Sequence, residues 1–418
     1  MQSLVMSPPL LQHRRVSGLS GNEIYCLNLI DLKPGQLCVG NSVMALGLGR
    51  GLSAGLATLA GGEVTAVTQL VHRARSQAFE RLMAEAQRDG GLGVTGLCFE
   101  VINHGGNLEF ITLGSTVHGA GEAGARHFST SGDAQQLYCQ VDSGFTPLQF
   151  VFGNVAYSIG VGGNILGRLR SLARGEIIEF SEIFDRTRHL ALERITDEAK
   201  KHGASAVLGI QTTITSLLGT QEMVMVGTAA THPLLTGHAD APVSSDMTPE
   251  EMWNMVHLGY MPVRLVMGVS VYSLGIKGSL GAALTSLIGG EVSGLTELLY
   301  EARSKALARI EREAERYQAD QVIGVKVRIY DLGFGLVELM AIGTAVKKIP
   351  GSQTKTNHLP AQAIMQDRET LIDSTQRTSL KGSTRASAHQ TQRGPLVWLI
   401  SAVGVVFYLV LKIVILKR

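Results

Sequence analysis

The stretch 62–78 reads GEVTAVTQLVHRARSQA, and two later stretches follow the same plan: 175–191 reads GEIIEFSEIFDRTRHLA and 290–306 reads GEVSGLTELLYEARSKA. In each stretch an arginine follows twelve residues after the glutamate of the opening Gly-Glu pair. Apolar residues recur between them every three or four positions, the spacing of a helix that buries one face. The chain is therefore a tandem repeat, and each copy is predicted to contain one long amphipathic helix.

The shared register extends beyond these stretches in both directions. A glycine ends an apolar run 22 positions before the glycine of each Gly-Glu pair, and a second glutamate stands 22 positions after its glutamate. These positions are Gly40, Gly153 and Gly268, and Glu85, Glu198 and Glu313. We place the copies at 22–118, 135–231 and 250–347, after an N-terminal tail at 1–21.

Each copy is predicted to be an α+β domain with the order β-α-α-β-β. In the third copy, 262–272 is apolar and β-branched, which is typical of a strand, while 275–289 has apolar residues at helical spacing among glycines. The long helix follows, and then two strands around a glycine-containing turn. We expect the long helix to cover one face of an antiparallel sheet. The connectors at 119–132 and 236–249 are polar or glycine-rich, which indicates loops.

The last part of the chain has a different character. Residues 351–393 are rich in Gln, Thr and Ser with scattered Lys and Arg, which predicts a disordered stalk. Residues 394–416 are apolar apart from Lys412, and about twenty such residues span a bilayer. A buried core helix would normally keep a polar stripe, which this segment lacks. Since positive charge marks the cytoplasmic side, we expect a single-pass C-terminal membrane anchor with the repeats in the cytoplasm.

Composition excludes several classes of protein. The 418 residues carry a net charge of only +2, so nothing indicates nucleic-acid binding. The four cysteines are far apart, which argues against a disulfide framework or a cysteine-built zinc site. The first fifteen residues lack an apolar core, so no secretory signal is predicted.

The third copy contains four short motifs: GGE at 289–291, EARSKA at 301–306, VIGV at 322–325 and GTAV at 343–346. In these motifs it resembles the YbjQ-like family of small bacterial proteins, which carries a heavy-metal-binding label. The second copy is also similar, with GASAVLG at 203–209, while the first has drifted. The resemblance covers the three copies but neither stalk nor anchor. It implies dodecin-like domains that assemble into closed five-membered rings, and it implies no catalysis.

Charged residues that recur in all three copies are the candidate site residues. The last strand of each copy carries a glutamate that needs a partner, and the helix arginine is the obvious candidate because a planar guanidinium can hold a partly buried carboxylate. The glutamate of each Gly-Glu pair is placed near a helix start, where an anion complements the dipole. The later glutamate follows an arginine by four positions, as in a helical i,i+4 pair. We expect structural or intersubunit ion pairs at Glu63, Arg75, Glu85, Glu109, Glu176, Arg188, Glu198, Glu222, Glu291, Arg303, Glu313 and Glu338.

Spacing gives little support for a metal, a nucleotide or catalysis. No histidine recurs in all three copies, and the position shared by Cys26 and Cys139 holds Asn254 in the third. The glycine-rich patches at 47–51 and 160–163 lack the full GxGxxG spacing and are interpreted as packing positions. No nucleophile or general base recurs. We expect no cofactor and no enzymatic activity.

These observations predict a membrane-anchored, homo-oligomeric, ring-forming binding or scaffold protein. Its partners would be further copies of itself and, through 394–416, the lipid bilayer, with no nucleic acid. The alternative is a heavy-metal-binding protein whose sites form between subunits and therefore leave no local spacing signal. An enzyme acting at ring interfaces is a third, less supported class.

Overall fold

The computed structural model describes residues 16–45, 62–104, 107–119, 127–158, 175–218, 220–273, 293–333 and 336–365. The chain divides into two units, Met1–Lys381 and Gly382–Arg418, and every described residue belongs to the first.

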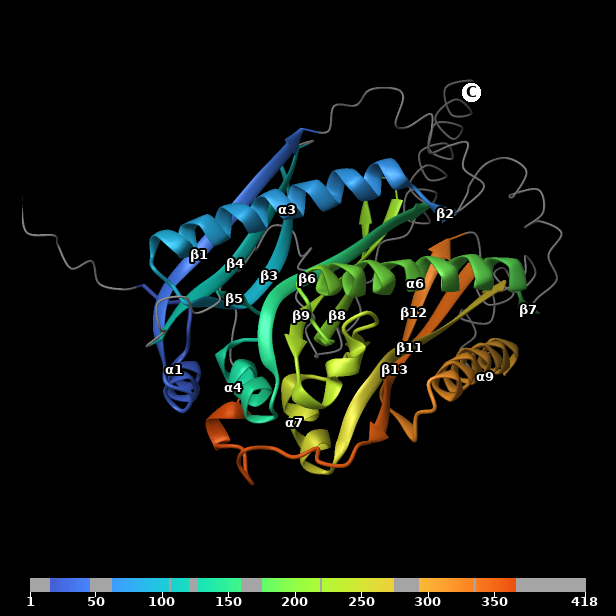
Figure 1. Ribbon diagram of the computed structural model, residues 1–418. Helices are drawn as coiled ribbons and strands as arrows, with labels where there is room; N and C mark the ends of the chain where they lie inside the picture. Colours follow the sequence, from blue (N-terminus) through green and yellow to red (C-terminus); the bar gives the residue numbers. More distant parts are fainter. Residues whose placement is uncertain are drawn as a thin grey trace, which may run out of the picture. The chain divides into compact units, whose positions relative to one another are not determined.

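Three tandem α+β domains make up the described chain (Figure 1). The first consists of α1 (Gly21–Asn28), β1 (Leu32–Ala45), β2 (Gly62–Glu63), α3 (Thr65–Arg88), β3 (Gly93–His104) and β4 (Asn107–Gly119). The second consists of β5 (Phe128–Ser129), α4 (Ala134–Asp142), β6 (Thr146–Ser158), β7 (Gly175–Glu176), α6 (Ile178–Lys201), β8 (Ala206–Leu217) and β9 (Thr220–Thr231). The third consists of β10 (Val243–Ser244), α7 (Pro249–His257), β11 (Tyr260–Ser273), α9 (Ser293–Arg316), β12 (Gln321–Gly333) and β13 (Leu336–Lys348). Two short 3₁₀ helices, η1 (Pro233–His238) and η2 (Ala361–Ala363), lie outside these sets.

Each domain is built on an antiparallel sheet whose last strand lies in the middle, in the orders β1-β4-β3, β6-β9-β8 and β11-β13-β12. The first strand of each sheet shifts register next to a proline: Pro34, Pro147 and Pro262. Proline has no N–H to give to the ladder, so it is tolerated at such irregular points.

The long helix of each domain packs on its own sheet, as the repeats predict (Figure 1). One glycine per domain sets the distance between them. A Cβ atom on Gly40, Gly153 or Gly268 would lie only 2.0, 2.4 or 2.1 Å from the carbonyl oxygen of a helix alanine. Since real Cβ atoms never approach so closely, only glycine allows the helix to lie this near the strand.

Each domain has a short helix before its first long strand, which the predicted order β-α-α-β-β omits. These helices, α1, α4 and α7, begin with capping boxes formed by Ser20 and Glu23, Asp133 and Gln136, and Thr248 and Glu251. The order is wrong at this point because helices of eight or nine residues are too short for a clear apolar period, although the capping pattern was readable. The short helix expected at 275–289 lies outside the described residues.

The connectors, predicted to be loops, contain short strands that extend the sheet of the preceding domain. In the 119–132 connector, β5 pairs in parallel with β3. In the 236–249 connector, β10 pairs in parallel with β8. The loop prediction is wrong here because a two-residue strand has no period of its own and forms only against an existing edge.

Part of the predicted disordered stalk is ordered. The segment that follows β13 passes the short helices, where the Lys355 amide donates to the Asp142 carbonyl at 2.8 Å and the Thr356 hydroxyl donates to the Asp142 carboxylate at 2.8 Å. Ala363 is fully buried. Residues 351–365 therefore gain tertiary contacts that a composition argument does not foresee. The rest of the stalk and the anchor predicted at 394–416 lie outside the described residues, among which no helix is long and apolar enough to cross a membrane.

Candidate functional site

A buried arginine of the first domain pairs with a buried glutamate of the second. The guanidinium of Arg75, on α3, donates to both carboxylate oxygens of Glu222, on β9, at 2.5 and 2.8 Å. Neither side chain is exposed. Asn154 of β6 also donates to Glu222, at 2.9 Å, and the guanidinium lies 5.8 and 5.5 Å from the ring centroids of Phe99 and Phe110. This bidentate, charge-assisted contact fixes the two domains in one orientation.

The second and third domains repeat the contact. Arg188, on α6, donates to the two carboxylate oxygens of Glu338, on β13, at 3.0 and 2.7 Å, and both side chains are fully buried. The Tyr157 hydroxyl accepts from the same guanidinium. Burial alone would lower the pKa of Arg188, but the Glu338 carboxylate beside it reverses this effect and raises the pKa above its ordinary value. The arginine is therefore charged at every relevant pH.

The sequence prediction named these residue types as partners, and the structure pairs each arginine with the glutamate of the next domain. That rule leaves Glu109 and Arg303 without such a partner among the described residues. Glu109, on β4, instead accepts from Asn41 at 2.8 Å and contacts His104 at 2.7 Å, and these two hydrogen bonds lower its pKa. Arg303, on α9, is exposed and lies over the Tyr300 ring at 5.5 Å.

The glutamates of the Gly-Glu pairs also act between domains. Glu63 accepts from Arg194 of the second domain at 2.8 and 3.0 Å, and β2 adds to β6. Glu176 accepts from Arg309 of the third domain at 2.8 Å, and β7 adds to β11. Burial alone would raise the pKa of Glu176, but hydrogen bonds, first of all from Arg309, lower it. Glu291, the third member of this set, lies outside the described residues.

The remaining glutamates do not form the predicted i,i+4 pairs. Glu85 accepts from the Val39 amide at 3.1 Å, Glu198 contacts Lys201 at 2.7 Å, and Glu313 accepts from the Met267 amide at 2.9 Å. The arginines four positions earlier reach other partners, because they point toward the first strand of their own sheet. The backbone carbonyls that they reach belong to Asn41, Asn154 and Val269.

A histidine that sequence reasoning did not select also joins two domains. The Nε2 atom of His189, on α6, lies 3.3 Å from the Glu313 carboxylate on α9, and its Nδ1 donates to the Asp185 carbonyl at 2.8 Å. Burial alone would lower the pKa of His189, but the hydrogen bond to Glu313 and the charges of Glu313 and Asp185 raise it to about 9. The signal that was missed is its place beside Arg188, where the other copies hold Ser76 and Ser304.

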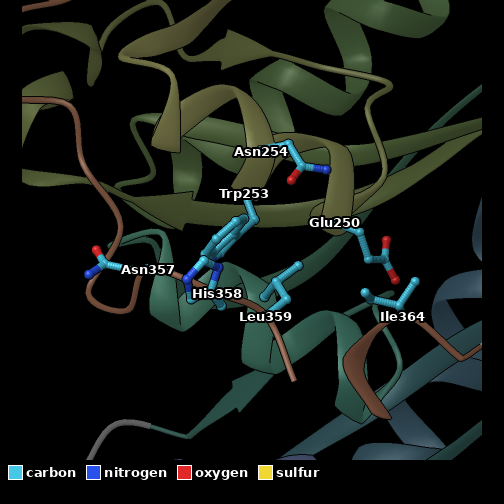
Figure 2. A pocket seen from close by; sticks show the side chains of 7 residues that line it. All are labelled: Glu250, Trp253, Asn254, Asn357, His358, Leu359 and Ile364. Atoms are coloured by element: carbon cyan, nitrogen blue, oxygen red, sulfur yellow. The ribbon is translucent and has the colours of Figure 1, made fainter. Parts of the chain in front are cut away.

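The buried cysteines give little support for a metal site, and a small cavity lies beside them. Cys26 and Cys139 belong to one buried apolar cluster with Trp253, and burial raises the pKa of Cys26 to about 11. A thiol with so high a pKa stays protonated at neutral pH, whereas metals bind the thiolate. Figure 2 shows the neighbouring pocket, of about 300 Å³, lined in part by Glu250, Trp253 and His358. Within the part of the chain that the structure describes, no group of three His, Cys, Asp or Glu side chains could hold a metal ion.

These ion pairs therefore join neighbouring domains. The buried ion pairs have their donors and acceptors directed at each other, and the chemistry that they perform is to fix one domain against the next. The structure brings together Arg75 with Glu222, Arg188 with Glu338, Arg194 with Glu63 and Arg309 with Glu176.

Comparison with known proteins matches the three domains separately. The YbjQ family model, described as "Putative heavy-metal-binding", matches residues 33–119, 145–232 and 260–348. An encapsulin nanocompartment protein of Mycobacterium tuberculosis is 29% identical over 243 residues, which cover 56% of this chain and 90% of that protein. A UPF0145 protein of Thermoplasma acidophilum is 37% identical over 99 residues, 22% of this chain and 83% of that protein. A UPF0145 protein of Thermotoga maritima is 43% identical over 83 residues, which cover 20% of this chain and 78% of that protein. The comparison with solved structures gives no match.

Proposed function

The chain belongs to the YbjQ family, whose domain it contains three times, and we propose that it is a membrane-anchored, homo-oligomeric scaffold or binding protein without catalytic activity. The observation that carries this proposal is the repeated contact between domains. One buried Arg–Glu pair joins the first domain to the second, and an equivalent pair joins the second to the third. A surface that forms the same contact twice in one chain is built for assembly.

One relative supports this direction. The mycobacterial relative carries the name of a nanocompartment protein. From that name we take only the expectation that this chain also works within an assembly. The anchor at 394–416 and the cytoplasmic placement of the domains rest on the sequence alone and are part of the proposal.

Light scattering on the full-length chain in detergent, with the detergent mass subtracted, tests the proposal. We expect a particle that contains two or more chains at micromolar concentration. A particle of one chain would contradict homo-oligomeric assembly. Membrane fractionation of the full chain and of a variant that ends at residue 393 tests the anchor. If the anchor spans the membrane, only the full chain should stay in the membrane fraction at high pH.

A metal-handling function ranks second, because only the description of the family model favours it. Elemental analysis of the chain purified without chelators tests it. Stoichiometric metal would favour this alternative, in which the ligands come from different subunits.

A further inference from the structure

The middle domain shows what a fully joined domain looks like. Its sheet has five strands, because β2 of the first domain adds at one edge and β10, which leads into the third domain, adds at the other. The first and third sheets have four described strands each. The first sheet has no counterpart of β2 beside β1, and the third has no counterpart of β10 beside β12, among the residues described.

The third domain leaves exposed the strand face that the other two domains bury. In the first domain, Leu97 and Phe99 of β3 are 2% and 1% exposed, because the second domain covers them. Their counterparts on β12, Val325 and Val327, are 41% and 42% exposed, and Ile329 is 58% exposed. We call Val325, Val327 and Ile329, together with Arg303 on α9, the tail face. Its three strand residues are apolar although the described structure leaves them in solvent.

The first domain leaves exposed the strand face that the second domain buries against the domain before it. On β6, Phe152 and Ala156 are 7% and 0% exposed because they pack against the first domain. Their counterparts on β1, Val39 and Val43, are 44% and 54% exposed. We call Val39, Asn41 and Val43, together with Glu109 on β4, the head face. Its glutamate holds the position of Glu222 and Glu338.

The charges of the two faces are complementary. Arg303 holds the repeat position of Arg75 and Arg188, which pair with the glutamate of the following domain, and Glu109 holds the position of the glutamates that they meet. Asn41 already donates to Glu109, as Asn154 donates to Glu222. We propose that the tail face of one chain binds the head face of a second copy of this chain, with Arg303 donating to the carboxylate of Glu109.

The occupant is a second copy because each chain carries one half of a contact that it already forms twice internally. The contact is heterologous, so successive chains add head to tail and either close into a ring or continue as a filament. In a closed ring of whole chains joined in this way, the number of domains is a multiple of three. His104, which contacts Glu109 in the single chain, gives way to Arg303 on assembly.

The inference rests on the proposed homo-oligomeric function, and charge reversal tests it separately. Arg303→Glu and Glu109→Arg each place two like charges in the contact between chains. Because Arg303 is exposed and Glu109 is partly exposed in the single chain, neither change should unfold it, which circular dichroism checks. We expect each variant to raise the concentration at which the assembly dissociates by about a hundredfold or more, measured by light scattering in detergent.

A mixture of the two variant chains gives the decisive measurement. When the two variant chains are combined in equal amounts, the changed position 303 of one chain meets the changed position 109 of the other, so the pair forms with its charges exchanged. The native pair forms at the alternate contact. Assembly should return in the mixture and also in the double variant Glu109→Arg/Arg303→Glu. The matched controls are Arg312→Glu and Glu80→Arg, which change exposed residues on α9 and α3 and should leave assembly unchanged.

The outcomes separate the two proposals. If the native chain assembles and the single variants assemble equally well, the head-to-tail contact is wrong, and another surface or the C-terminal segment holds the oligomer. If the native chain is a single chain, both the inference and the homo-oligomeric function are wrong. Loss of assembly in the single variants without recovery in the mixture would also overturn the pairing of Arg303 with Glu109.

Discussion

Phe99 and Val327 hold the same position in the first and third domains, yet one is buried and the other is 42% exposed. Phe99 packs edge-on against Phe150 and Phe152, with ring centroids 5.2 and 5.0 Å apart. The strands β3 and β12 both pair with the last strand of their own domain, β4 and β13, so the difference arises from the neighbouring domain and not from the fold of the domain itself. Burial at such a position measures whether a following domain is present.

The largest effect is expected from breaking a joined pair. Glu338→Gln leaves the buried Arg188 guanidinium without its counter-charge, and we expect a loss of about 3–5 kcal/mol in the free energy of unfolding. Urea unfolding followed by tryptophan fluorescence measures it, because Trp253 of the third domain donates to Asp142 of the second at 2.5 Å and reports on this junction. A Trp398→Phe background removes the second tryptophan.

Two further variants serve as controls for this prediction. Arg312→Met, an exposed change on α9, should stay within about 0.5 kcal/mol of the native chain. Replacing both partners, as Arg188→Met/Glu338→Leu, should recover most of the loss, because no unpaired charge remains buried. A single Glu338→Gln variant as stable as the native chain would show that the pair is not buried in solution.

The next effect compares the two strand faces directly. Phe99→Ala should cost about 3 kcal/mol or more, because it removes a buried ring from the junction of the first and second domains. Val327→Ala, measured at concentrations where chains are single, should cost less than about 1 kcal/mol. Equal losses at the two positions would mean that the tail face is covered even in the single chain.

The smallest effect concerns pH. The pKa of His189 is about 9 in the folded chain and about 6.5 unfolded, so its contribution to stability is fully present below about pH 6.5 and is lost as pH rises through 9. The difference between these two pKa values corresponds to about 3 kcal/mol. Because solvent screens the partly exposed His189 side chain, we expect the junction of the second and third domains to lose about 1–2 kcal/mol over this window. Urea unfolding at pH 6 and pH 9.5 measures it. His189→Gln should remove the slope, while His238→Gln, at an exposed position, should keep it.

Much of each domain could be predicted from its sequence because the signals repeat. The long helices follow from the apolar spacing in 62–78, 175–191 and 290–306, and the hairpins follow from alternating residues around a turn. The short opening helices and the connector strands β5 and β10 could not be read from periodicity. They form because an existing helix or sheet edge is next to them, which a local pattern does not record.

The site shows a similar limit. The repeated arginine and glutamate identified the groups that pair, but a tandem repeat gives every arginine three glutamates at the same position of three copies. Only the packing of β6 and β11 on the preceding domain decides that Arg75 meets Glu222 and not Glu109. Asn41 and Asn154, which share a repeat position, were a readable sign that this strand face is polar at one point.

The contact of Trp253 with Asp142 has a consequence for symmetry. Thr356 donates to the same Asp142 carboxylate, and the equivalent positions in the first domain hold neither a tryptophan nor an aspartate: they are Tyr25 and Leu29. In a ring of single-domain subunits, any substitution is copied onto every contact at once. A chain of three linked domains can instead change one contact and leave the others as they are. The pocket in Figure 2 is lined in part by Trp253, a position that holds Tyr25 and Tyr138 in the first and second domains, so its lining can change without changing the other two domains.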